Sequence, residues 1–335
     1  MRKLTPPTTL KGQGELALID RIRRRAAKSS GTRLSLGIGD DCALLRLKAS
    51  EEIAVTTDLS IEGRHFRLDL HPPEAIGHRA LARGLSDIAA MGARPIAAFL
   101  SLGAPPELIL ASRPKAPAWI DRFLDGFFCL ADKHKTPLAG GDLAQSPIAV
   151  ADVVLIGSVP RGKALLRSGS KPGDLLYVTG SLGGSSLGLR QLGSAGAGDL
   201  QPHLYPQPRI APGLWLQQRT AVSAAIDISD GISTDLHHLC EESGVSAEIQ
   251  TSCLPIFPGA SLEDALNGGE DYELLFTAHA NTRIPRRIGG VPVTRIGVIT
   301  RSRIATPRVL LVDALRRGRP LEPRGWEHFR TGTPE

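Results

Sequence analysis

The feature that most constrains the fold is the alternation of short apolar runs with amphipathic stretches along 335 residues. In the first half, residues 53–57, 96–102 and 148–159 are predicted strands, and residues 119–134 repeat apolar side chains at helical spacing. This alternation is typical of α/β or α+β domains. Because single cores rarely grow beyond about 250–300 residues, a chain of this length with 41% hydrophobic residues predicts two packed domains.

The domain boundary is predicted after residue 160, which gives an N-terminal domain of residues 1–160 and a C-terminal domain of residues 161–335.

Asp174 lies in a Lys-Pro-Gly-Asp sequence and is interpreted as a turn residue. Further predicted elements are a helix that follows Pro72-Pro73 and stops near residues 91–95, a strand at 175–178, a helix opened by residues 179–185, a proline-rich connection at 202–212 and a strand at 224–226 that runs into Asp227.

Cysteine spacing and hydropathy predict a soluble cytoplasmic protein that does not enter a membrane. No apolar core of signal-peptide length follows Met1, and the most apolar run, residues 148–159, is interrupted by Asp152. Four cysteines without a Cys-x-x-Cys pair or zinc spacing are expected to be reduced thiols. They are Cys42, Cys129, Cys240 and Cys253.

The net charge of +6 does not indicate nucleic-acid binding. The basic residues are scattered rather than gathered on one predicted face, and aromatic residues make up only 4% of the chain. Single-stranded nucleic acids are usually bound through aromatic stacking platforms in a basic groove. Solvated helix faces explain the basic clusters, and no nucleic-acid partner is expected.

Aspartates concentrate in five short motifs, at the ends of apolar runs or beside glycines. The motifs are Gly37-Ile38-Gly39-Asp40-Asp41, Thr56-Thr57-Asp58, Leu85-Ser86-Asp87, Gly140-Gly141-Asp142 and Asp227-Ile228-Ser229-Asp230-Gly231. Each alone is also ordinary turn chemistry. Together they predict a magnesium–polyphosphate site, because Mg²⁺ takes oxygen ligands from carboxylates and phosphates, and glycine lets backbone N–H groups approach phosphates.

Other phosphate-binding motifs are absent from the sequence. There is no Gly-x4-Gly-Lys-[Ser/Thr] loop and no protein-kinase catalytic loop. The glycine-rich turn at residues 180–184 has no lysine. It is interpreted as a structural turn, with phosphate binding at the following helix N-terminus as the alternative.

Eight segments follow one another in a distinctive order. They are Gly37 to Ala43, Thr57-Asp58 through Glu62-Gly63-Arg64-His65-Phe66, Leu85 to Ala93, Gly140-Gly141-Asp142, Arg167-Ser168-Gly169, Asp227 to Gly231, Gly268-Gly269-Glu270-Asp271-Tyr272-Glu273-Leu274 and Gly325-Trp326-Glu327-His328-Phe329. In this order they resemble the thiamine-monophosphate kinases, a branch of the aminoimidazole-ribonucleotide-synthetase-like superfamily. The resemblance covers nearly the whole chain.

The resemblance implies a two-domain α/β (α+β) fold, a homodimer formed through the N-terminal sheet, and a C-terminal domain that closes over nucleotide and substrate. It implies ATP as co-substrate and several Mg²⁺ ions. The implied magnesium ligands are Asp41, Thr56, Thr57, Asp58, Asp87, Asp142, Asp227 and Asp230. The implied ATP contacts are Gly141, Asp142, Arg167 and Ser229, and the implied contacts to thiamine phosphate are His65, Glu270 and Trp326.

Three of these residues also have structural interpretations. His65 beside Phe66 can be a structural histidine, Glu270 can cap a helix, and Trp326 can anchor the C-terminus in a core. The chain also departs from the family pattern, with Gly84 where an asparagine is usual and Leu143-Ala144 where two threonines are usual. The second departure removes hydroxyls near the nucleotide and bears on affinity more than on reaction type.

The predicted function is ATP-dependent phosphorylation of thiamine monophosphate to thiamine diphosphate, a phosphotransferase reaction with a phosphate acceptor in thiamine biosynthesis. The acceptor is already deprotonated at neutral pH, so no general base or covalent catalytic residue is expected. The alternatives are another ATP-dependent member of the superfamily, such as aminoimidazole ribonucleotide synthetase or selenophosphate synthetase, and a catalytically silent protein that binds nucleotide or thiamine phosphate.

Overall fold

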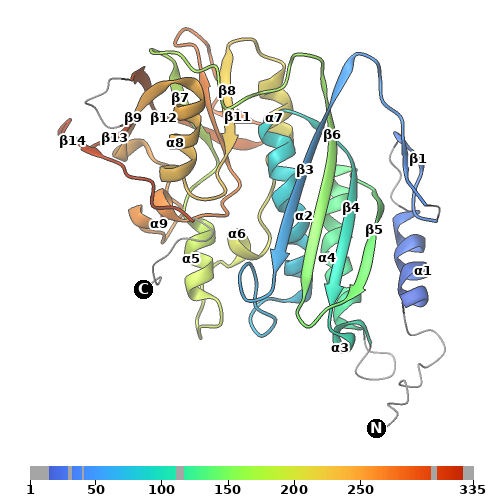
Figure 1. Ribbon diagram of the computed structural model, residues 1–335. Helices are drawn as coiled ribbons and strands as arrows, with labels where there is room; N and C mark the ends of the chain where they lie inside the picture. The colour runs from blue at the N-terminus through green and yellow to red at the C-terminus, as the bar shows by residue number, and fades with distance from the viewer. Residues whose placement is uncertain (1–14, 29–31, 40, 111–116, 303–307, 327–335) are drawn as a thin grey trace. The chain divides into compact units, whose positions relative to one another are not determined.

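The computed structural model describes residues 15–28, 32–39, 41–110, 117–302 and 308–326 (Figure 1). The chain forms two compact units. The first comprises Met1–Lys48, Thr57–Leu81 and Ile96–Leu155, and the second comprises Ala49–Thr56, Ala82–Pro95 and Ile156–Glu335. Parts of the predicted N-terminal domain therefore contribute to both units, and the boundary after residue 160 stays a prediction.

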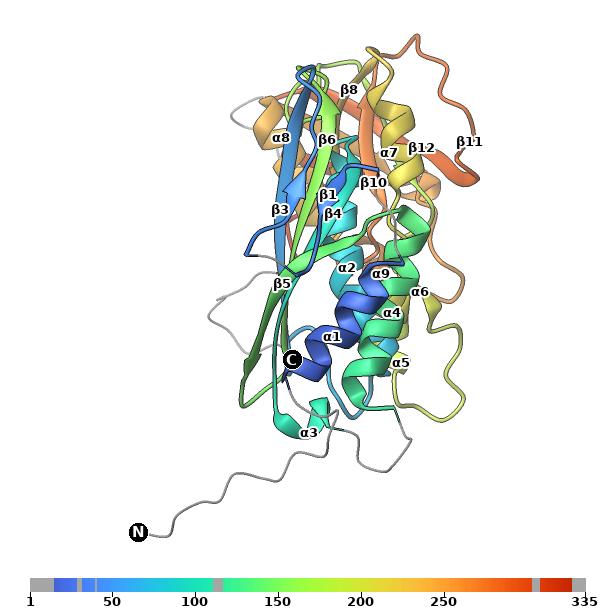
Figure 2. The same ribbon diagram turned by 90° about the vertical axis from the view of Figure 1, so that its right-hand side faces the viewer.

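The N-terminal half builds a four-stranded sheet in the order β3-β6-β4-β5. Its strands are β3 (Glu51–Ile61), β4 (Arg94–Ala104), β5 (Leu138–Gln145) and β6 (Val150–Pro160). Strands β4 and β5 are parallel, with Leu100 opposite Gly141 and Ser101 opposite Asp142. Helices α2 (Pro73–Ala90) and α4 (Trp119–His134) lie on one face of this sheet, and α1 (Glu15–Ala26) lies near β5 (Figures 1 and 2).

Two glycines let α2 and α4 pack closely. A Cβ on Gly77 of α2 would lie 1.9 Å from the Phe123 carbonyl oxygen, and a Cβ on Gly126 of α4 would lie 1.8 Å from the Glu74 carbonyl oxygen. Neither position can hold a larger residue unless the helix backbones separate. Buried Phe123 and Phe127 of α4 fill the core beside this crossing.

The other face of the sheet is only partly covered. Along β3, Ile53, Val55 and Leu59 are 53%, 63% and 47% exposed, as expected for alternate residues on one side of a strand. In β6, buried Ala151, Val153 and Leu155 alternate with half-buried residues. The apolar run at 148–159 therefore has cover on one face within the chain, although a run of this kind predicts cover on both.

The C-terminal half builds a mostly antiparallel sheet in the order β14-β13-β9-β12-β7-β10-β8, with β11 paired to β12. Only β9 and β13 are parallel among its described pairs. The strands are β7 (Leu175–Thr179), β8 (Val222–Asp227), β9 (Val245–Gln250), β10 (Leu274–Ala278), β11 (Arg287–Ile288), β12 (Val291–Arg301), β13 (Val309–Val312) and β14 (Gly318–Pro320). Apolar side chains of helix α8 (Ile232–Ser243) share one buried core cluster with this sheet.

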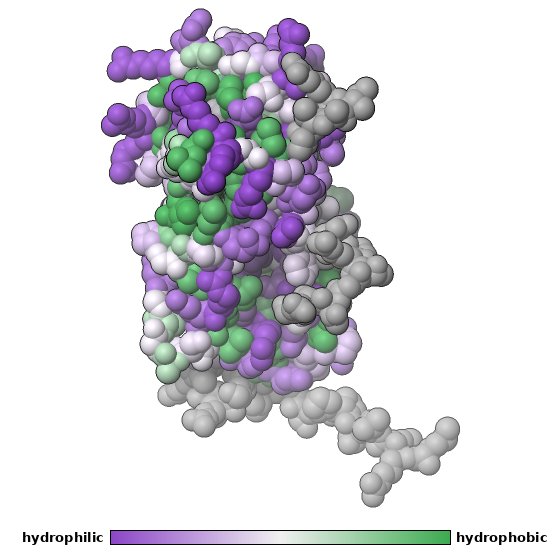
Figure 3. All heavy atoms as spheres, turned by 90° about the vertical axis from the view of Figure 1, so that its left-hand side faces the viewer, coloured by the Kyte–Doolittle hydropathy of each residue, from purple (hydrophilic) through white to green (hydrophobic). Residues whose placement is uncertain are grey.

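Shorter elements complete the chain. They are the strands β1 (Leu34–Leu36) and β2 (Leu44–Leu45), the helices α3 (Pro106–Ile109), α5 (Gly184–Gln191), α6 (Gln201–Leu204), α7 (Ile210–Gln217) and α9 (Leu262–Asn267), and the 3₁₀ turn Thr251–Cys253. In the face shown in Figure 3, hydrophilic residues form most of the projecting tips, and apolar residues lie between them. Within the described ranges, no helix is both long enough and apolar enough to span a bilayer.

Most predicted elements form, with two corrections. The helix expected at 119–134 has those bounds, and the helix expected after Pro72-Pro73 ends at Ala90. The strand expected at residues 53–57 continues to Ile61, so Asp58, which was expected just beyond its end, lies inside β3. The proline-rich connection at 202–212 contains most of α6 and the start of α7. All four cysteines are free thiols, as expected.

Candidate active site

The loop after β8 is held against a second loop by backbone hydrogen bonds. Strands β8 and β10 are antiparallel, with Asp227 opposite Leu274. Beyond this pair the ladder continues, because the Tyr272 N–H donates to the Ile228 carbonyl (2.9 Å) and the Glu270 N–H to the Ser229 carbonyl (2.7 Å). The predicted nucleotide contact Ser229 and the predicted substrate contact Glu270 are therefore neighbours.

The second loop has an unusual backbone. Glu270 and Tyr272 have positive φ values of 64° and 51°, in the left-handed region that residues with a Cβ rarely adopt. Gly269 approaches closely, since its Cβ would lie 2.6 Å from the Ser229 carbonyl oxygen. Helix α9 is capped by Ser261 instead of Glu270. Backbone strain of this kind is often found where a side chain must be held for a ligand.

The C-terminal segment at Gly325 and Trp326 packs on the same loop. The Trp326 N–H donates to the Asp230 carbonyl (3.0 Å), and the Gly325 N–H donates to the Thr234 hydroxyl (3.0 Å). The Trp326 side chain is 49% exposed. The backbone anchors this segment while the indole ring is not buried in a core, so the ring can serve as a contact surface. The rest of this motif, Glu327-His328-Phe329, lies outside the described residues, as does Asp40.

Helix α2 brings a serine and a further acidic residue to this region. The buried Ser86 hydroxyl donates to Asp227 Oδ2 at 2.6 Å. The next residue, Asp87, accepts a hydrogen bond from the Thr56 hydroxyl of β3. These contacts place four predicted site residues together, since Asp227 and Asp230 share one loop and Thr56 and Asp87 share a hydrogen bond.

Burial and neighbouring charges shift the pKa of Asp87 in opposite directions. Burial raises its pKa, while the Thr56 hydrogen bond and the positive charges of Arg167 and Arg83 lower it. Arg167 is exposed and near enough to act on this carboxyl group electrostatically. A guanidinium beside acidic side chains is well suited to bind phosphate oxygens.

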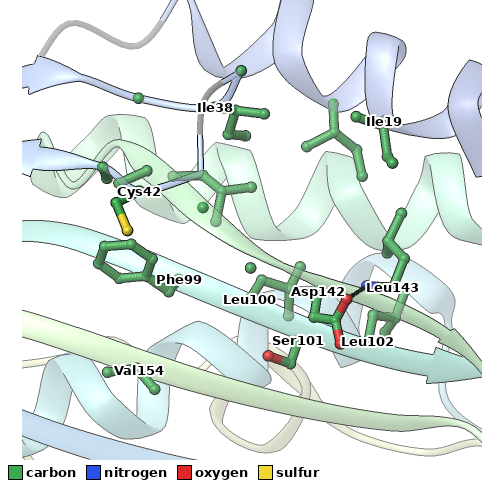
Figure 4. Close-up of a pocket in the computed structure, with 18 of the residues that line it drawn as sticks. Ile19, Ile38, Cys42, Phe99, Leu100, Ser101, Leu102, Asp142, Leu143 and Val154 are labelled. Carbon is green, nitrogen blue, oxygen red and sulfur yellow. Dashed lines mark hydrogen bonds between the residues drawn. The ribbon is translucent and has the colours of Figure 1, made fainter.

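Asp41, Gly141 and Asp142 line a pocket of about 710 Å³ in the first unit (Figure 4). Gly141 has a φ of 147°, and a Cβ there would lie 1.8 Å from the Leu100 carbonyl oxygen, so only glycine fits. Asp142 is exposed, and its Oδ1 accepts the Leu143 N–H at 2.9 Å. The remaining lining is mainly apolar, including Ile19, Ile38, Leu102 and Leu124. The pocket thus combines an apolar wall with carboxylates.

Strand alternation separates two residues of the Thr-Thr-Asp motif. Thr56 and Asp58 point to one side of β3, and Thr57 points to the other, as successive residues of a strand do. The Thr57 hydroxyl donates to Asp152 Oδ1 at 2.8 Å, on the partly covered face of the sheet. The structure therefore does not bring the Thr57 side chain to the side occupied by Thr56.

His65 has a structural contact of its own. Its ring Nδ1 accepts the Ile61 backbone N–H at 3.0 Å, and the backbone N–H of His65 donates to the Ile61 carbonyl at 2.9 Å. The neutral ring therefore carries its proton on Nε2. This supports the structural interpretation and leaves the substrate role a prediction.

The glycine-rich turn before α5 is structural. Asp271 accepts the N–H groups of Gly183 (2.6 Å) and Ser185 (3.1 Å), so these helix N-terminal donors already bind a carboxyl group. Burial raises the Asp271 pKa to about 7, although these amide bonds oppose the rise. Asp174 also matches its predicted role, because its N–H donates to the Lys171 carbonyl (2.9 Å) within a turn.

The oxygen-bearing side chains gathered here are of the kind that binds magnesium. The gathered side chains offer carboxylate oxygens from Asp87 and Asp227 and hydroxyl oxygens from Thr56 and Ser86. Among the described residues, no three acidic, histidine or cysteine side chains close on one point. That arrangement is compatible with Mg²⁺, which is usually bound by one or two carboxylates together with substrate phosphates.

Comparison with known proteins identifies the family. The model for AIR synthase related protein, N-terminal domain, matches residues 39–159, and the model for its C-terminal domain matches residues 171–309. A thiamine-monophosphate kinase of Escherichia coli strain K12 is 38% identical over 340 residues, covering 95% of this chain and 99% of that protein. The chain belongs to the thiamine-monophosphate kinase family.

Solved structures of the thiamine-monophosphate kinase family have the same fold. The enzyme from Stenotrophomonas maltophilia K279a is 36% identical and superposes with a TM-score of 0.74. The superposition covers 89% of this chain and 96% of the Stenotrophomonas chain. AaThiL complexed with AMPPCP and TMP is 31% identical, covers 97% of this chain and 100% of its own, and gives 0.71. The hydrogenase maturation protein HypE, at 17% identity and a TM-score of 0.73, shares the fold.

Proposed function

We propose that this protein transfers the γ-phosphoryl group of ATP to the phosphate of thiamine monophosphate, giving thiamine diphosphate and ADP. The observation that carries the proposal is the convergence on one loop, residues 227–231, of separate motifs from across the sequence. Glu270 and Trp326 bind this loop through their backbone N–H groups, and Ser86 binds it through Asp227. The family relatives named as thiamine-monophosphate kinases support the same reaction.

The acidic residues are proposed to hold Mg²⁺ on the ATP phosphates. Bound there, Mg²⁺ would neutralise charge on the phosphates and so favour attack by an anionic acceptor. The proposed ligands are Asp41, Thr56, Thr57, Asp58, Asp87, Asp142, Asp227 and Asp230, of which Thr57 has the least support from side-chain placement. Arg167, Ser229 and Gly141 are proposed to contact the nucleotide, and the apolar pocket beside Asp142 has a wall suited to its base.

Glu270, Trp326 and His65 are proposed to orient thiamine phosphate. A carboxylate and an aromatic face both attract a cationic ring such as a thiazolium. Positioning the acceptor phosphate in line with the γ-phosphate is the main requirement for phosphoryl transfer, since that phosphate is already ionised. The proposed reaction requires no residue of this chain to remove a proton or to form a covalent intermediate.

The reaction is tested by product identification. The purified protein is incubated with ATP, Mg²⁺ and, separately, thiamine monophosphate, thiamine and the substrate of aminoimidazole ribonucleotide synthetase, and products are identified by mass. We expect thiamine diphosphate from the first mixture only. Turnover with the ribonucleotide would favour the sister activity, and binding without turnover would favour a silent binding protein.

Trp326→Ala is expected to weaken use of thiamine monophosphate while sparing ATP. Loss of a cation–π contact costs about 0.5–2 kcal/mol, so the KM for the acceptor should rise about 2- to 30-fold. The measurement is steady-state kinetics with each substrate varied in turn, and Trp326→Phe is the matched control that keeps an aromatic face. Equal loss for both substrates would instead indicate a structural anchor.

A homodimer through the N-terminal sheet is also proposed. Ile53, Val55 and Leu59 form an exposed apolar row on β3. The hydrogen bond between Thr57 and Asp152 places the half-buried residues of the neighbouring strand β6 on the same face of the sheet. Long apolar sheet faces of this kind are seldom left in water. A second copy of the same chain would cover them by two-fold symmetry.

Val55→Asp is expected to convert the dimer to a monomer. The carboxylate would be buried against an apolar partner surface, which is strongly unfavourable. Light scattering at micromolar concentration should give twice 35.6 kDa for the wild type and 35.6 kDa for the variant. Leu189→Asp, at a residue that is 53% exposed on α5, is the control and should leave the mass unchanged. A wild-type monomer would contradict the proposal.

A further inference from the structure

Asp235 of α8 holds the loop 227–231 from beneath. Its Oδ2 accepts three consecutive backbone N–H groups, from Ser229 (3.1 Å), Asp230 (3.2 Å) and Gly231 (3.1 Å). The residue is only 2% exposed. A buried carboxyl group with one oxygen engaged three times is held rigidly, and so is the backbone that it binds.

Helix α8 begins without a side-chain cap. Its N-cap residue is Gly231, with a φ of 113° and no side chain to accept an N–H group of the first turn. Asp235, one turn into the helix, instead reaches back to the N–H of this N-cap residue and to the two loop amides before it. Gly231 is also tightly enclosed, since its Cβ would lie 2.9 Å from the Asn267 carbonyl carbon. The helix start is therefore compatible with one loop conformation.

The loop so fixed carries the acidic residues of the site. Asp227 lies at the end of β8, where Ser86 binds its Oδ2, and Asp230 lies between two of the amides that Asp235 binds. Ser86 and Asp235 therefore act on the two ends of one short segment. Asp235 itself is too enclosed to be a ligand, because its Oδ2 is already occupied by the three amides and almost none of its surface is exposed.

We propose that Asp235 is a positioning residue that sets the geometry of Asp227 and Asp230 for a divalent cation bound with the nucleotide. The inference rests on the proposed magnesium–nucleotide site. Loss of residues that orient metal ligands typically lowers metal affinity or activity about 10- to 100-fold. Asp235→Ala should therefore weaken cation binding by about that factor, and Asp235→Asn, which keeps one oxygen acceptor, should fall between Asp235→Ala and the wild type.

The test measures Mn²⁺ binding by electron paramagnetic resonance in the presence of a non-hydrolysable ATP analogue. Glu242→Gln is the matched control, because it removes a negative charge from an exposed position on the same helix. We expect the control to match the wild type and Asp235→Ala to bind Mn²⁺ far more weakly. In turnover assays, the Mg²⁺ concentration for half-maximal rate should rise, while the KM for thiamine monophosphate at saturating Mg²⁺ stays near the wild-type value.

Two results would overturn the inference. One is a folded Asp235→Ala protein that binds Mn²⁺ within a factor of two of the wild type. The other is an unfolded Asp235→Ala protein together with an Asp235→Asn protein of wild-type Mn²⁺ affinity, which would make the residue a stability determinant only. Because Mn²⁺ binding requires no acceptor, failure to phosphorylate thiamine monophosphate would count against the proposed reaction and leave this test intact.

Discussion

Asp227→Asn is expected to reduce kcat for phosphoryl transfer by about 10²–10³-fold, the range seen when one preorganised electrostatic contact is removed from a transition state. Asparagine keeps the shape of the side chain and can still accept the hydrogen bond from Ser86, which is 2.6 Å away in the native protein. What it removes is the negative charge. The loss should therefore appear in the rate of transfer and in the Mg²⁺ requirement, with the fold retained.

Asp174→Asn is the matched control for this variant. Asp174 is also a buried aspartate in the C-terminal half, but it binds Ser223 (2.7 Å) and His279 (3.0 Å), and it belongs to no proposed ligand group. Its replacement should lower the melting temperature more than kcat. Near-wild-type turnover by Asp227→Asn, or an equal loss in both variants, would contradict the ligand assignment of Asp227.

Asp142→Asn is expected to cause a loss of similar size, from the other unit of the chain. Asp142 is an exposed residue of β5, so its replacement should change stability little. Its carboxylate follows Gly141, whose positive φ and close approach to Leu100 fix the direction of the strand at that point. A drop of about 10²-fold or more in kcat, with an unchanged melting curve, is the expected outcome.

Asp125→Asn provides the comparison for Asp142→Asn. Asp125 is an exposed carboxylate on α4 that pairs with Arg25 and lies in the same unit. It should keep full activity. If Asp142→Asn also keeps full activity, then the Gly-Gly-Asp motif on β5 is a structural feature, and the proposed ligands would be limited to the group around Asp87 and Asp227.

Sequence patterns predicted the helices and the identity of the motifs well. The bounds of α4 follow from an unbroken apolar stripe, and α2 is delimited by the prolines before it and by Gly92 after it. Strand β3 was underestimated, because Thr57, Asp58 and Ser60 interrupt its apolar pattern. Strand pairing with β6 holds these polar residues in extended backbone, a long-range contact that local propensity does not report.

The contacts that organise the site were harder to predict. Ser86 lies 141 positions from Asp227 and Asp235 lies 8 positions from it. Neither separation matches a helix or strand repeat that would predict a contact with the loop at Asp227. Ser86 belongs to one of the aspartate motifs, whereas Asp235 lies outside all of them. The contact between Asp235 and the loop amides had one available signal, a helix that starts after glycine with an aspartate in its first turn. No such signal exists for Asp271, whose carboxyl group accepts the N–H groups of Gly183 and Ser185 at the start of α5.

The most direct test of the account follows the γ-phosphoryl group itself. The enzyme is mixed with γ-labelled ATP, Mg²⁺ and thiamine monophosphate, the reaction is quenched within one turnover, and label is measured on protein, inorganic phosphate and thiamine diphosphate. Direct transfer predicts label in thiamine diphosphate at a rate equal to ADP formation, with none on the protein. Label that stays on the protein before reaching the acceptor, or that is released as phosphate while thiamine monophosphate is unchanged, would contradict it.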